Sequence, residues 1–359
     1  MRKFVCGTLL LAAAIAGTTS SCSKGDSGPS VPDSLKVSLS ATTLSGTGFD
    51  GVTVTVKDRS GADVTGAVQL YADGVKFTGP VFYPDKVKTV KISAQKGSVP
   101  SNIAEVVVTA PEASPFTQKI LVEDFTGTWC KYCTRAADIL TRYTSKQPAC
   151  ISVGVHGGRA GEPFTYQYLN TFMDRFAIDG FPWAVLNRDS KWNENPALLD
   201  AALKKWAPLG LAIESKIESG NITGKVKVKF NLTTNVDMRV VIMLVEDKLV
   251  ADQENAYAEY GTVPTIKNYV HTNTLRRIAS DDVFSGDPIP STAVTKGNVW
   301  EKTFSLSTTG RTGIGTDYTA IPANCKVVAF VQYGPENSTG RKGAINVQYT
   351  NAGDTKDFD

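Results

Sequence analysis

The feature that most constrains the fold is a pair of cysteines placed between an apolar run and an apolar helical pattern, within residues 119–143. Residues 120–125 predict a buried strand, Gly127 interrupts it, and apolar residues then return at helical spacing. Cys130 and Cys133 therefore fall at a strand-to-helix turn, where free N–H groups and the helix dipole stabilise a thiolate. Because one helical turn brings the two sulfurs together, the pair can alternate between dithiol and disulfide.

A proline about fifty residues later strengthens this interpretation. Pro182 stands immediately before a second apolar run, where an ordinary strand would not tolerate it. A cis peptide bond between Phe181 and Pro182 would explain its position. With the Trp-Cys-Lys-Tyr-Cys motif of residues 129–133 ahead of this proline, the chain resembles the thioredoxin superfamily over residues 115–208. The resemblance implies an α/β thioredoxin-like domain there.

The resemblance also implies a role for each residue of the motif. Cys130 would attack the disulfide of a partner, and Cys133 would resolve the mixed disulfide. Asp124, six residues before Cys130, would be the buried acid that exchanges a proton with Cys133. Glu123 would take that part if the strand register differs by one residue. The motif alone does not indicate whether the site reduces, oxidises or isomerises.

Further candidate residues surround the motif. The backbone around Phe181 and Pro182 would pair with the substrate chain, and Trp129, Phe181 and Trp183 would form an apolar rim, although core packing is an alternative role for these aromatic side chains. His156 ends a predicted strand, 150–156, that should lie parallel to the strand before the cysteines, so both strands end at the same rim. We expect His156 to contact a substrate or influence the cysteines, the alternative being a surface or capping role.

The flanking segments predict two β-rich units. Residues 34–112 alternate apolar and polar positions between turn signals and resemble an immunoglobulin-like sandwich; they contain no Cys, His or Trp, which favours a spacer. Residues 209–350 return to a period of two and predict a C-terminal all-β sandwich. The long interval at 251–295 within it is either a functional excursion or a structured cover over the sheet. The predicted fold class is therefore multidomain, with a thioredoxin-like domain between two sandwiches.

The first residues carry targeting signals. Residues 1–22 combine a basic start, an apolar stretch at Phe4–Ala16 and small residues before Cys22, which predicts an export signal followed by lipidation of Cys22. Ordinary signal-peptidase cleavage nearby is the alternative. Residues 23–33 are rich in Ser, Gly and Pro and would form a tether. We expect a lipoprotein of the cell envelope, attached to the outer membrane and facing the periplasm or the cell surface.

Composition and cysteine count exclude several classes of partner and cofactor. Lys and Arg number 38 and Asp and Glu 35, a net charge of +3 that is too small to favour nucleic acid. A zinc site at Cys130 and Cys133 would need two more ligands, but the chain has only two histidines and no second Cys-x-x-Cys, so we expect no metal and no cofactor. Cys150 and Cys325 each open an apolar strand and are expected as buried thiols, an interdomain disulfide being the alternative.

Two segments outside the cysteine motif carry a second resemblance. Residues 268–276 (NYVHTNTLR) and 328–332 (VAFVQ), with the lipoprotein start, resemble the twenty-eight-kilodalton outer-membrane-protein family of Bacteroidetes. Two functions follow as expectations. One is a lipid-anchored thiol–disulfide oxidoreductase acting on dithiols or disulfides of exported proteins. The other is a non-catalytic binding or assembly lipoprotein, in which the cysteine pair is a structural staple and the sandwiches bind a protein or glycan.

Overall fold

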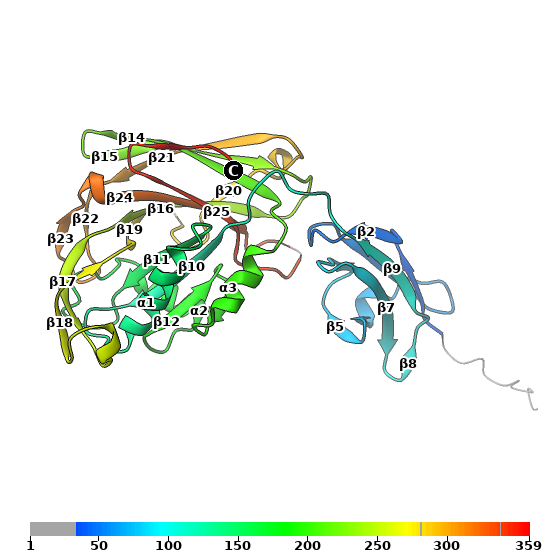
Figure 1. Ribbon diagram of the computed structural model, residues 1–359. Coiled ribbons are helices and arrows are strands. Elements are labelled where there is room, and N and C mark those ends of the chain that lie inside the picture. Colours follow the sequence, from blue (N-terminus) through cyan, green and yellow to red (C-terminus); the bar gives the residue numbers. More distant parts are fainter. Residues whose placement is uncertain (1–33, 281, 338) are drawn as a thin grey trace, which may run out of the picture.

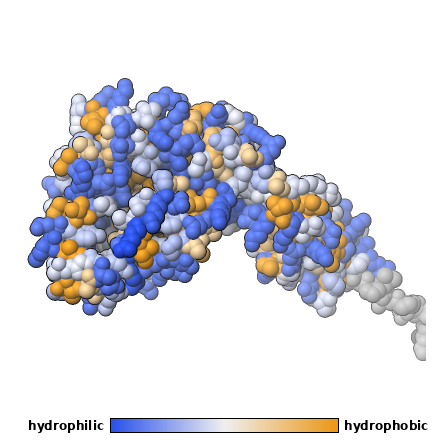
Figure 2. Space-filling model, viewed as in Figure 1, coloured by the Kyte–Doolittle hydropathy of each residue, from blue (hydrophilic) through white to orange (hydrophobic). Residues whose placement is uncertain are grey.

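The computed structural model describes residues 34–280, 282–337 and 339–359. The predicted signal sequence, the lipidation site Cys22 and the tether lie outside the described residues. A smaller N-terminal unit is joined by one extended segment to a larger body that contains the helices and the C-terminus (Figure 1). Both units show a mainly hydrophilic surface with scattered apolar patches in this view (Figure 2). Within the described ranges, no helix has the length and apolar character needed to cross a membrane.

The N-terminal unit is a sandwich of two small sheets, as its alternating pattern predicts. One sheet has the order β1 (Lys36–Leu39), β3 (Val52–Lys57), β6 (Val81–Phe82). The other has the order β2 (Thr43–Ser45), β9 (Ala104–Thr109), β7 (Lys88–Lys96), β4 (Gln69–Ala72), β5 (Val75–Phe77), with β8 (Val99–Pro100) on β7. Every second residue of β3 is buried, so one face of each strand fills the shared core.

The larger body is organised around a nine-stranded sheet in the described part of the chain. Its order is β13 (Ser190–Trp192), β12 (Trp183–Leu186), β10 (Ile120–Thr126), β11 (Cys150–His156), β19 (Thr274–Ile278), β16 (Met238–Glu246), β24 (Cys325–Tyr333), β25 (Ala344–Asn351), with β20 (Asp287–Ile289) beside β16. β10 runs parallel to β11 and antiparallel to β12. All seven residues of β10 are buried because both faces of this strand are covered.

Three helices cover the two faces of β10. Ile120 and Val122 pack with α1 (Cys133–Thr144) and α3 (Pro196–Leu203), whereas Leu121 and Phe125 pack with α2 (Leu169–Phe176) on the other face. Helix α2 begins only at Leu169. The segment before it contains Gly157, Gly158 and Gly161 with positive φ, a conformation that continues as a loop and not as a helix. The edge strand β13 is present but has three residues.

The predicted boundary at residues 208/209 does not separate two sheets. Strand β19, from the C-terminal half, pairs in parallel with β11 at Thr274 and Gly154, so one sheet runs through both predicted units. This pairing covers the edge that β11 would otherwise leave open. The C-terminal sandwich is completed by a second sheet in the order β21 (Val299–Ser307), β15 (Asn221–Phe230), β14 (Leu209–Glu218), β26 (Thr355–Lys356), packed on β16 and β24.

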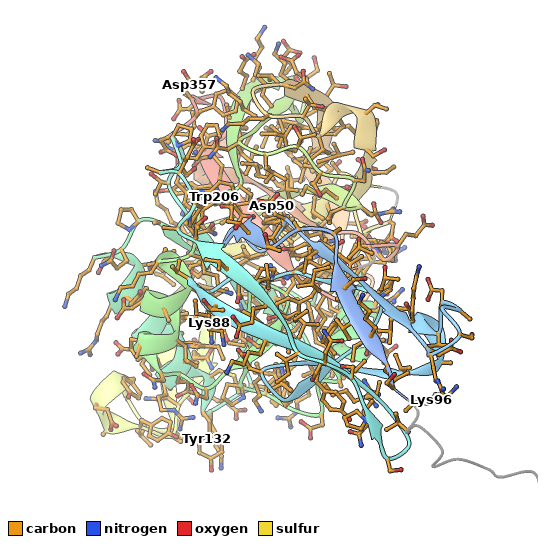
Figure 3. The ribbon with its side chains drawn as sticks, turned by 90° about the vertical axis from the view of Figure 1, so that its right-hand side faces the viewer. Asp50, Lys88, Lys96, Tyr132, Trp206 and Asp357 are labelled. Atoms are coloured by element: carbon orange, nitrogen blue, oxygen red, sulfur yellow. A yellow bond between two sulfur atoms is a disulfide. The ribbon has the colours of Figure 1, made fainter. Side chains whose placement is uncertain are left out.

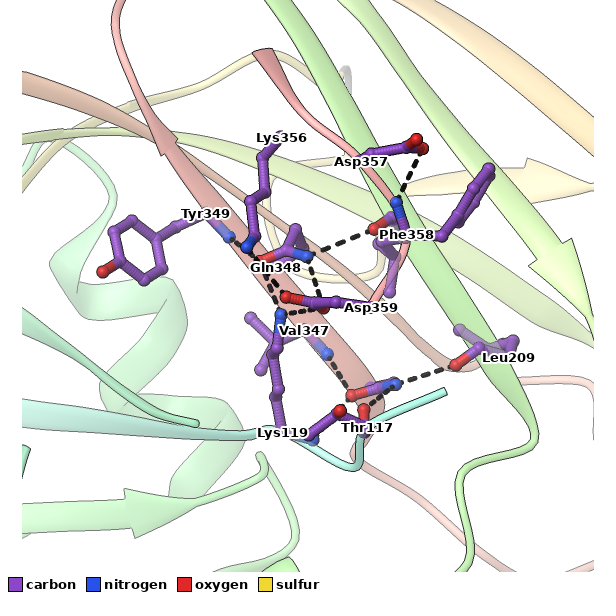
Figure 4. Close-up of polar contacts among 12 residues, drawn as sticks. Thr117, Lys119, Leu209, Val347, Gln348, Tyr349, Lys356, Asp357, Phe358 and Asp359 are labelled. Atoms are coloured by element: carbon purple, nitrogen blue, oxygen red, sulfur yellow. Dashed lines mark hydrogen bonds and ion pairs between the residues drawn. The ribbon is translucent and has the colours of Figure 1, made fainter. Parts of the chain in front are cut away.

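Residues near the C-terminus brace the start of β10 (Figure 4). The buried ammonium of Lys119 pairs with the Asp359 carboxylate, which also accepts a 3.0 Å hydrogen bond from Gln348. Asn346 accepts from the Lys119 N–H at 2.9 Å and donates to the Leu209 carbonyl at 2.8 Å. Burial lowers the pKa of Lys119, although its pairing with Asp359 opposes that shift. These contacts fix β10 against the second sheet.

Candidate functional site

The two cysteines of the motif form a disulfide at the end of β10. β10 ends at Thr126, a tight turn follows, and α1 begins at Cys133. The turn is closed by hydrogen bonds of 3.0 Å from the Cys130 N–H to the Gly127 carbonyl and from the Cys133 N–H to the Cys130 carbonyl. Cys130 and Cys133 are bonded to each other, and they are only 3% and 1% exposed. The strand–turn–helix geometry predicted from the sequence is therefore present, with the sulfurs covered.

The predicted rim residues lie together beside this turn. The Phe181–Pro182 peptide bond is cis. β12 places Trp183 opposite Phe125, so the cis-proline lies next to the end of β10. The Trp129 ring stacks on Phe181 with centroids 5.8 Å apart, and its Nε1 donates to a backbone carbonyl at 2.9 Å. All three rim side chains are partly exposed.

Asp124 faces the helix α1 side of the sheet, in a small polar cavity. The cavity has a volume of about 60 Å³, and its lining includes Asp124, Cys133, Gln253, Tyr269 and His271. Burial, followed by the nearby charge of Glu194, raises the pKa of Asp124 to about 7. One carboxyl oxygen, Oδ1, has no hydrogen-bond partner among the described residues. A polar cavity of this size can hold water, so Asp124 is equipped to exchange protons there.

Glu123, the alternative acid, points to the opposite face of the sheet. Its carboxylate accepts hydrogen bonds of 2.8, 3.0 and 3.2 Å from Arg188. Both side chains are almost fully buried, and the Arg188 guanidinium lies over the rings of Phe172, Phe284 and Phe330. The pair is a closed structural element with no route to the cysteines.

His156 lies beneath the rim and not on it. Only 2% of its surface is exposed, and its Nδ1 is 3.0 Å from Glu162 Oε1. The other oxygen of Glu162 accepts from the N–H and the hydroxyl of Thr128, at 2.6 and 2.7 Å. His156 therefore contacts the cysteine turn through Glu162, a residue that the sequence interpretation missed. The signal was an acid four residues after the glycine pair that follows His156.

The second histidine, His271, also packs against His156. Their ring centroids are 5.1 Å apart, and the rings meet edge to face. Burial, followed by the neighbouring His156, lowers the pKa of His271 to about 3, so this ring is neutral at physiological pH. Its Nε2 has no protein partner in the described ranges. This buried position gives His271 a packing role.

The long interval of the C-terminal half covers the cysteine turn. β17 (Leu249–Glu254) and β18 (Thr265–His271) form a hairpin beside α1. We call the segment 253–257 the hairpin clamp. Two of its backbone N–H groups and one side-chain amide donate hydrogen bonds to carbonyls of the turn. Part of this interval thus covers the cysteine turn, and the rest supplies strands β19 and β20 to the nine-stranded sheet. No sequence signal links the clamp to the cysteines, because more than one hundred residues separate them.

The remaining described cysteines are free thiols, as expected. Cys150 and Cys325 are both buried and unbonded. Burial raises the pKa of each thiol to about 12, so neither is reactive at neutral pH. Within the described ranges, no three His, Cys, Asp or Glu side chains are grouped so as to hold a metal ion.

A family model described as "Outer membrane protein Omp28" matches residues 169–356, more than half of the chain. The chain belongs to the Omp28 family. The family description supports an outer-membrane location. The matched region of this Omp28 protein includes the hairpin clamp and the cis-proline but begins after the two cysteines. No curated protein sequence matches the chain significantly.

Solved structures also resemble this Omp28 chain. "HBP35 of Porphyromonas gingivalis" aligns with a TM-score of 0.50 and 17% identity, over 67% of this chain and 76% of that one, which indicates a shared fold. The Yersinia pseudotuberculosis adhesin InvE aligns over 89% of this chain and 58% of its own, with 10% identity and a TM-score of 0.19. A β-glucosidase from Kluyveromyces marxianus gives 10% identity and 0.21, over 86% and 46%. The last two scores are too low to indicate a common fold.

Proposed function

We propose that this Omp28 protein is a thiol–disulfide oxidoreductase whose Cys130–Cys133 pair exchanges with dithiols or disulfides of exported proteins. The proposal treats residues 115–208 as a thioredoxin-like unit. The strand order β13-β12-β10-β11 supports it, as do α1 and α3 on one face of β10 and α2 on the other. The cis-proline beside the disulfide supports it further.

The observation that carries the proposal is the position of Asp124. A structural staple needs no titratable neighbour, whereas exchange needs a group that gives a proton to Cys133 and takes one back. Asp124 shares a cavity with Cys133, and its pKa of about 7 makes both protonation states available near neutral pH. No ion pair or protein hydrogen bond within the described chain satisfies its Oδ1.

The exchange proceeds in two steps. A partner thiolate attacks Sγ of Cys130, the Cys130–Cys133 bond breaks, and the Cys133 sulfur leaves with the electron pair and takes the proton of Asp124. The second partner thiol then gives its proton to the Asp124 carboxylate and attacks the partner sulfur of the mixed disulfide. Cys130 leaves as a thiolate, which the start of α1 stabilises. Two electrons pass from the partner dithiol to the cysteine pair, so the partner is oxidised, and the reverse sequence reduces a partner disulfide.

Other residues of the site would hold the partner and the turn. The partly exposed Trp129, Phe181 and Pro182 would offer an apolar ledge and free backbone to an extended partner chain. His156 and Glu162 would position the turn through Thr128. The flanking sandwiches would supply further contacts to a protein or glycan. Cys22 would carry the lipid anchor. Metabolic labelling with a palmitate analogue, compared between wild-type and Cys22→Ala cells, tests this.

The deciding experiment is the reduction potential of the cysteine pair. The purified protein is equilibrated in graded glutathione buffers, and thiols are counted by mass spectrometry, with Cys130→Ser as the control. The two free thiols of Cys150 and Cys325 provide an internal baseline. A potential between about −120 and −270 mV, the range of known oxidoreductases, supports the proposal. A pair that resists strongly reducing buffers in the folded protein contradicts it.

One observation favours the second candidate, a binding or assembly lipoprotein with a structural disulfide. Both cysteines are almost fully buried, whereas catalytic cysteines are usually partly exposed. In that case the Asp124→Asn variant would leave the rate of disulfide reduction unchanged at every pH, and partner binding would depend on the sandwich surfaces.

A further inference from the structure

Hydrogen bonds from the hairpin clamp hold the cysteine turn along its whole length. The backbone N–H of Glu254 donates to the Thr128 carbonyl at 2.7 Å, and that of Ala256 donates to the Lys131 carbonyl at 2.8 Å. The clamp segment thus lies along the turn like an added edge strand, with two backbone donors directed at turn carbonyls, whereas the Asn255 N–H between them donates to the Pro264 carbonyl.

Gln253 spans the turn from one end to the other. Its Nε2 donates to the Gly127 carbonyl at 3.2 Å and to the Cys130 carbonyl at 3.1 Å. The side chain is 3% exposed and lines the cavity that holds Asp124 and Cys133. Gln253 therefore both ties the turn and forms part of the wall between that cavity and the hairpin.

Three further contacts extend the clamp onto the start of α1. The Thr134 hydroxyl donates to Asn255 Oδ1 at 2.9 Å. The Tyr257 hydroxyl lies within hydrogen-bond distance of Arg135, which forms an ion pair with Glu194 at 2.5 Å. Tyr132, at the lower end of the larger body in Figure 3, packs against Tyr257 with centroids 5.9 Å apart. The first turn of the helix is thus attached to the hairpin by polar and aromatic contacts.

The hairpin itself is suited to move as a unit. In the described part of the chain, β17 and β18 pair only with each other and join neither large sheet. Val250 and Val270 are 58% and 50% exposed, so these two apolar side chains of the hairpin contribute little packing against the rest of the protein. An isolated two-stranded hairpin is only marginally stable, and elements of this kind open before the core does.

We propose that the hairpin clamp is a built-in lock on the cysteine pair, with Gln253 as its positioning residue. This inference rests on the proposed redox function. A partner sulfur cannot reach Cys130, which is 3% exposed, unless covering atoms are displaced. Opening of the clamp frees four turn carbonyls and exposes the Asp124 cavity, and closing protects the disulfide. The lock limits exchange to partners that bind long enough, or tightly enough, to displace the hairpin.

The test compares how fast the disulfide of folded protein is reduced by tris(2-carboxyethyl)phosphine in wild type and in clamp variants. Gln253→Met keeps the side-chain length and removes the donors, and Asn255→Ala removes the contact to Thr134. Val270→Ala, on the exposed side of the same hairpin, is the matched control. Thermal melting verifies that each variant is folded, and hydrogen exchange by mass spectrometry follows the amides of residues 253–257.

The lock predicts that Gln253→Met is reduced about tenfold faster than wild type, the effect expected for two lost neutral hydrogen bonds. Amide exchange in the clamp should rise in parallel, while the control matches wild type. A purely structural role would lower the melting temperature without faster exchange confined to the clamp. Equal reduction rates in all variants overturn the lock, yet leave the redox function standing if the potential lies in the oxidoreductase range. If the disulfide cannot be reduced in any variant, both the lock and the redox function are overturned.

Discussion

Glu123 and Asp124 are neighbours on β10, and their side chains point to opposite faces of the nine-stranded sheet. Glu123 meets the guanidinium of Arg188, which is itself enclosed by aromatic rings. Asp124 is also buried, but it lines a small polar cavity that Cys133 lines as well. The same chemical group is thus neutralised on one face by a partner and on the other by a proton. The difference lies in what satisfies each buried acid, because Glu123 has a counter-charge beside it and Asp124 has a polar cavity.

The largest effect on stability should come from breaking the ion pair between Glu123 and Arg188. Glu123→Gln leaves the Arg188 charge buried without its partner and should reduce the free energy of unfolding by about 3–5 kcal/mol. Urea denaturation followed by fluorescence measures it. The matched double variant Glu123→Leu with Arg188→Met removes both charges and should be far less destabilised. A Glu123→Gln protein as stable as wild type would contradict the closed role of the pair.

The next effect concerns Asp124, whose Oδ1 has no hydrogen-bond partner among the described residues. Because the folded-state pKa of Asp124 is raised to about 7, the folded protein holds its proton more tightly than the unfolded chain does. Its contribution to stability is therefore greatest at acid pH and is lost as pH rises through about 7, by about 3 kcal/mol between about pH 5 and about pH 7.

Asp124→Asn removes this dependence. The difference between the unfolding free energies of Asp124→Asn and wild type should therefore grow in favour of the variant as pH rises. Denaturant titrations at a series of pH values measure it, and a difference that stays constant with pH would contradict the raised pKa. The same variant should reduce the rate of exchange with a dithiol by about 100-fold at neutral pH, since it cannot supply the proton to Cys133.

A smaller effect should come from Glu162, a buried acid that is bonded to His156 and Thr128 instead of an arginine. Burial raises the pKa of Glu162, but hydrogen bonds from His156 and Thr128 outweigh it, so the net pKa is lowered. Glu162→Gln keeps the shape and loses the charge, which should cost about 1–2 kcal/mol of stability. Because the folded pKa is depressed, this loss should disappear at pH values below it. A cost that persists unchanged in acid would contradict an ionised Glu162.

Local sequence patterns were sufficient for much of this arrangement. The strand at β10, the turn with its disulfide and the cis-proline each follow from residues close together in the chain. The alternation of β10 also placed two acids on opposite faces, although only the structure shows which one faces the cysteines. His156 was placed at the correct strand end, but its burial depends on Glu162 and on the ring of His271.

The rest depended on contacts between distant residues. The pairing of β19 with β11 joins Thr274 to Gly154, and nothing in either segment specifies the other. The contact of Gln253 with the turn has the same origin, because a glutamine in a polar hairpin has no distinctive pattern. Tertiary pairing of this kind is selected by shape and by open sheet edges, which a single sequence does not display.

The pairing of β19 with β11 has a consequence for the order of assembly. A chain grows from its N-terminus, so the cysteines exist before the strand and hairpin that cover them have been made. Until Thr274 has been made, the edge of β11 is unpaired and the cysteine turn lacks its contacts with the hairpin. Contacts of such long sequence separation also form late and slowly. The newly made protein therefore passes through a stage in which the cysteine turn is uncovered, and the finished molecule has closed it.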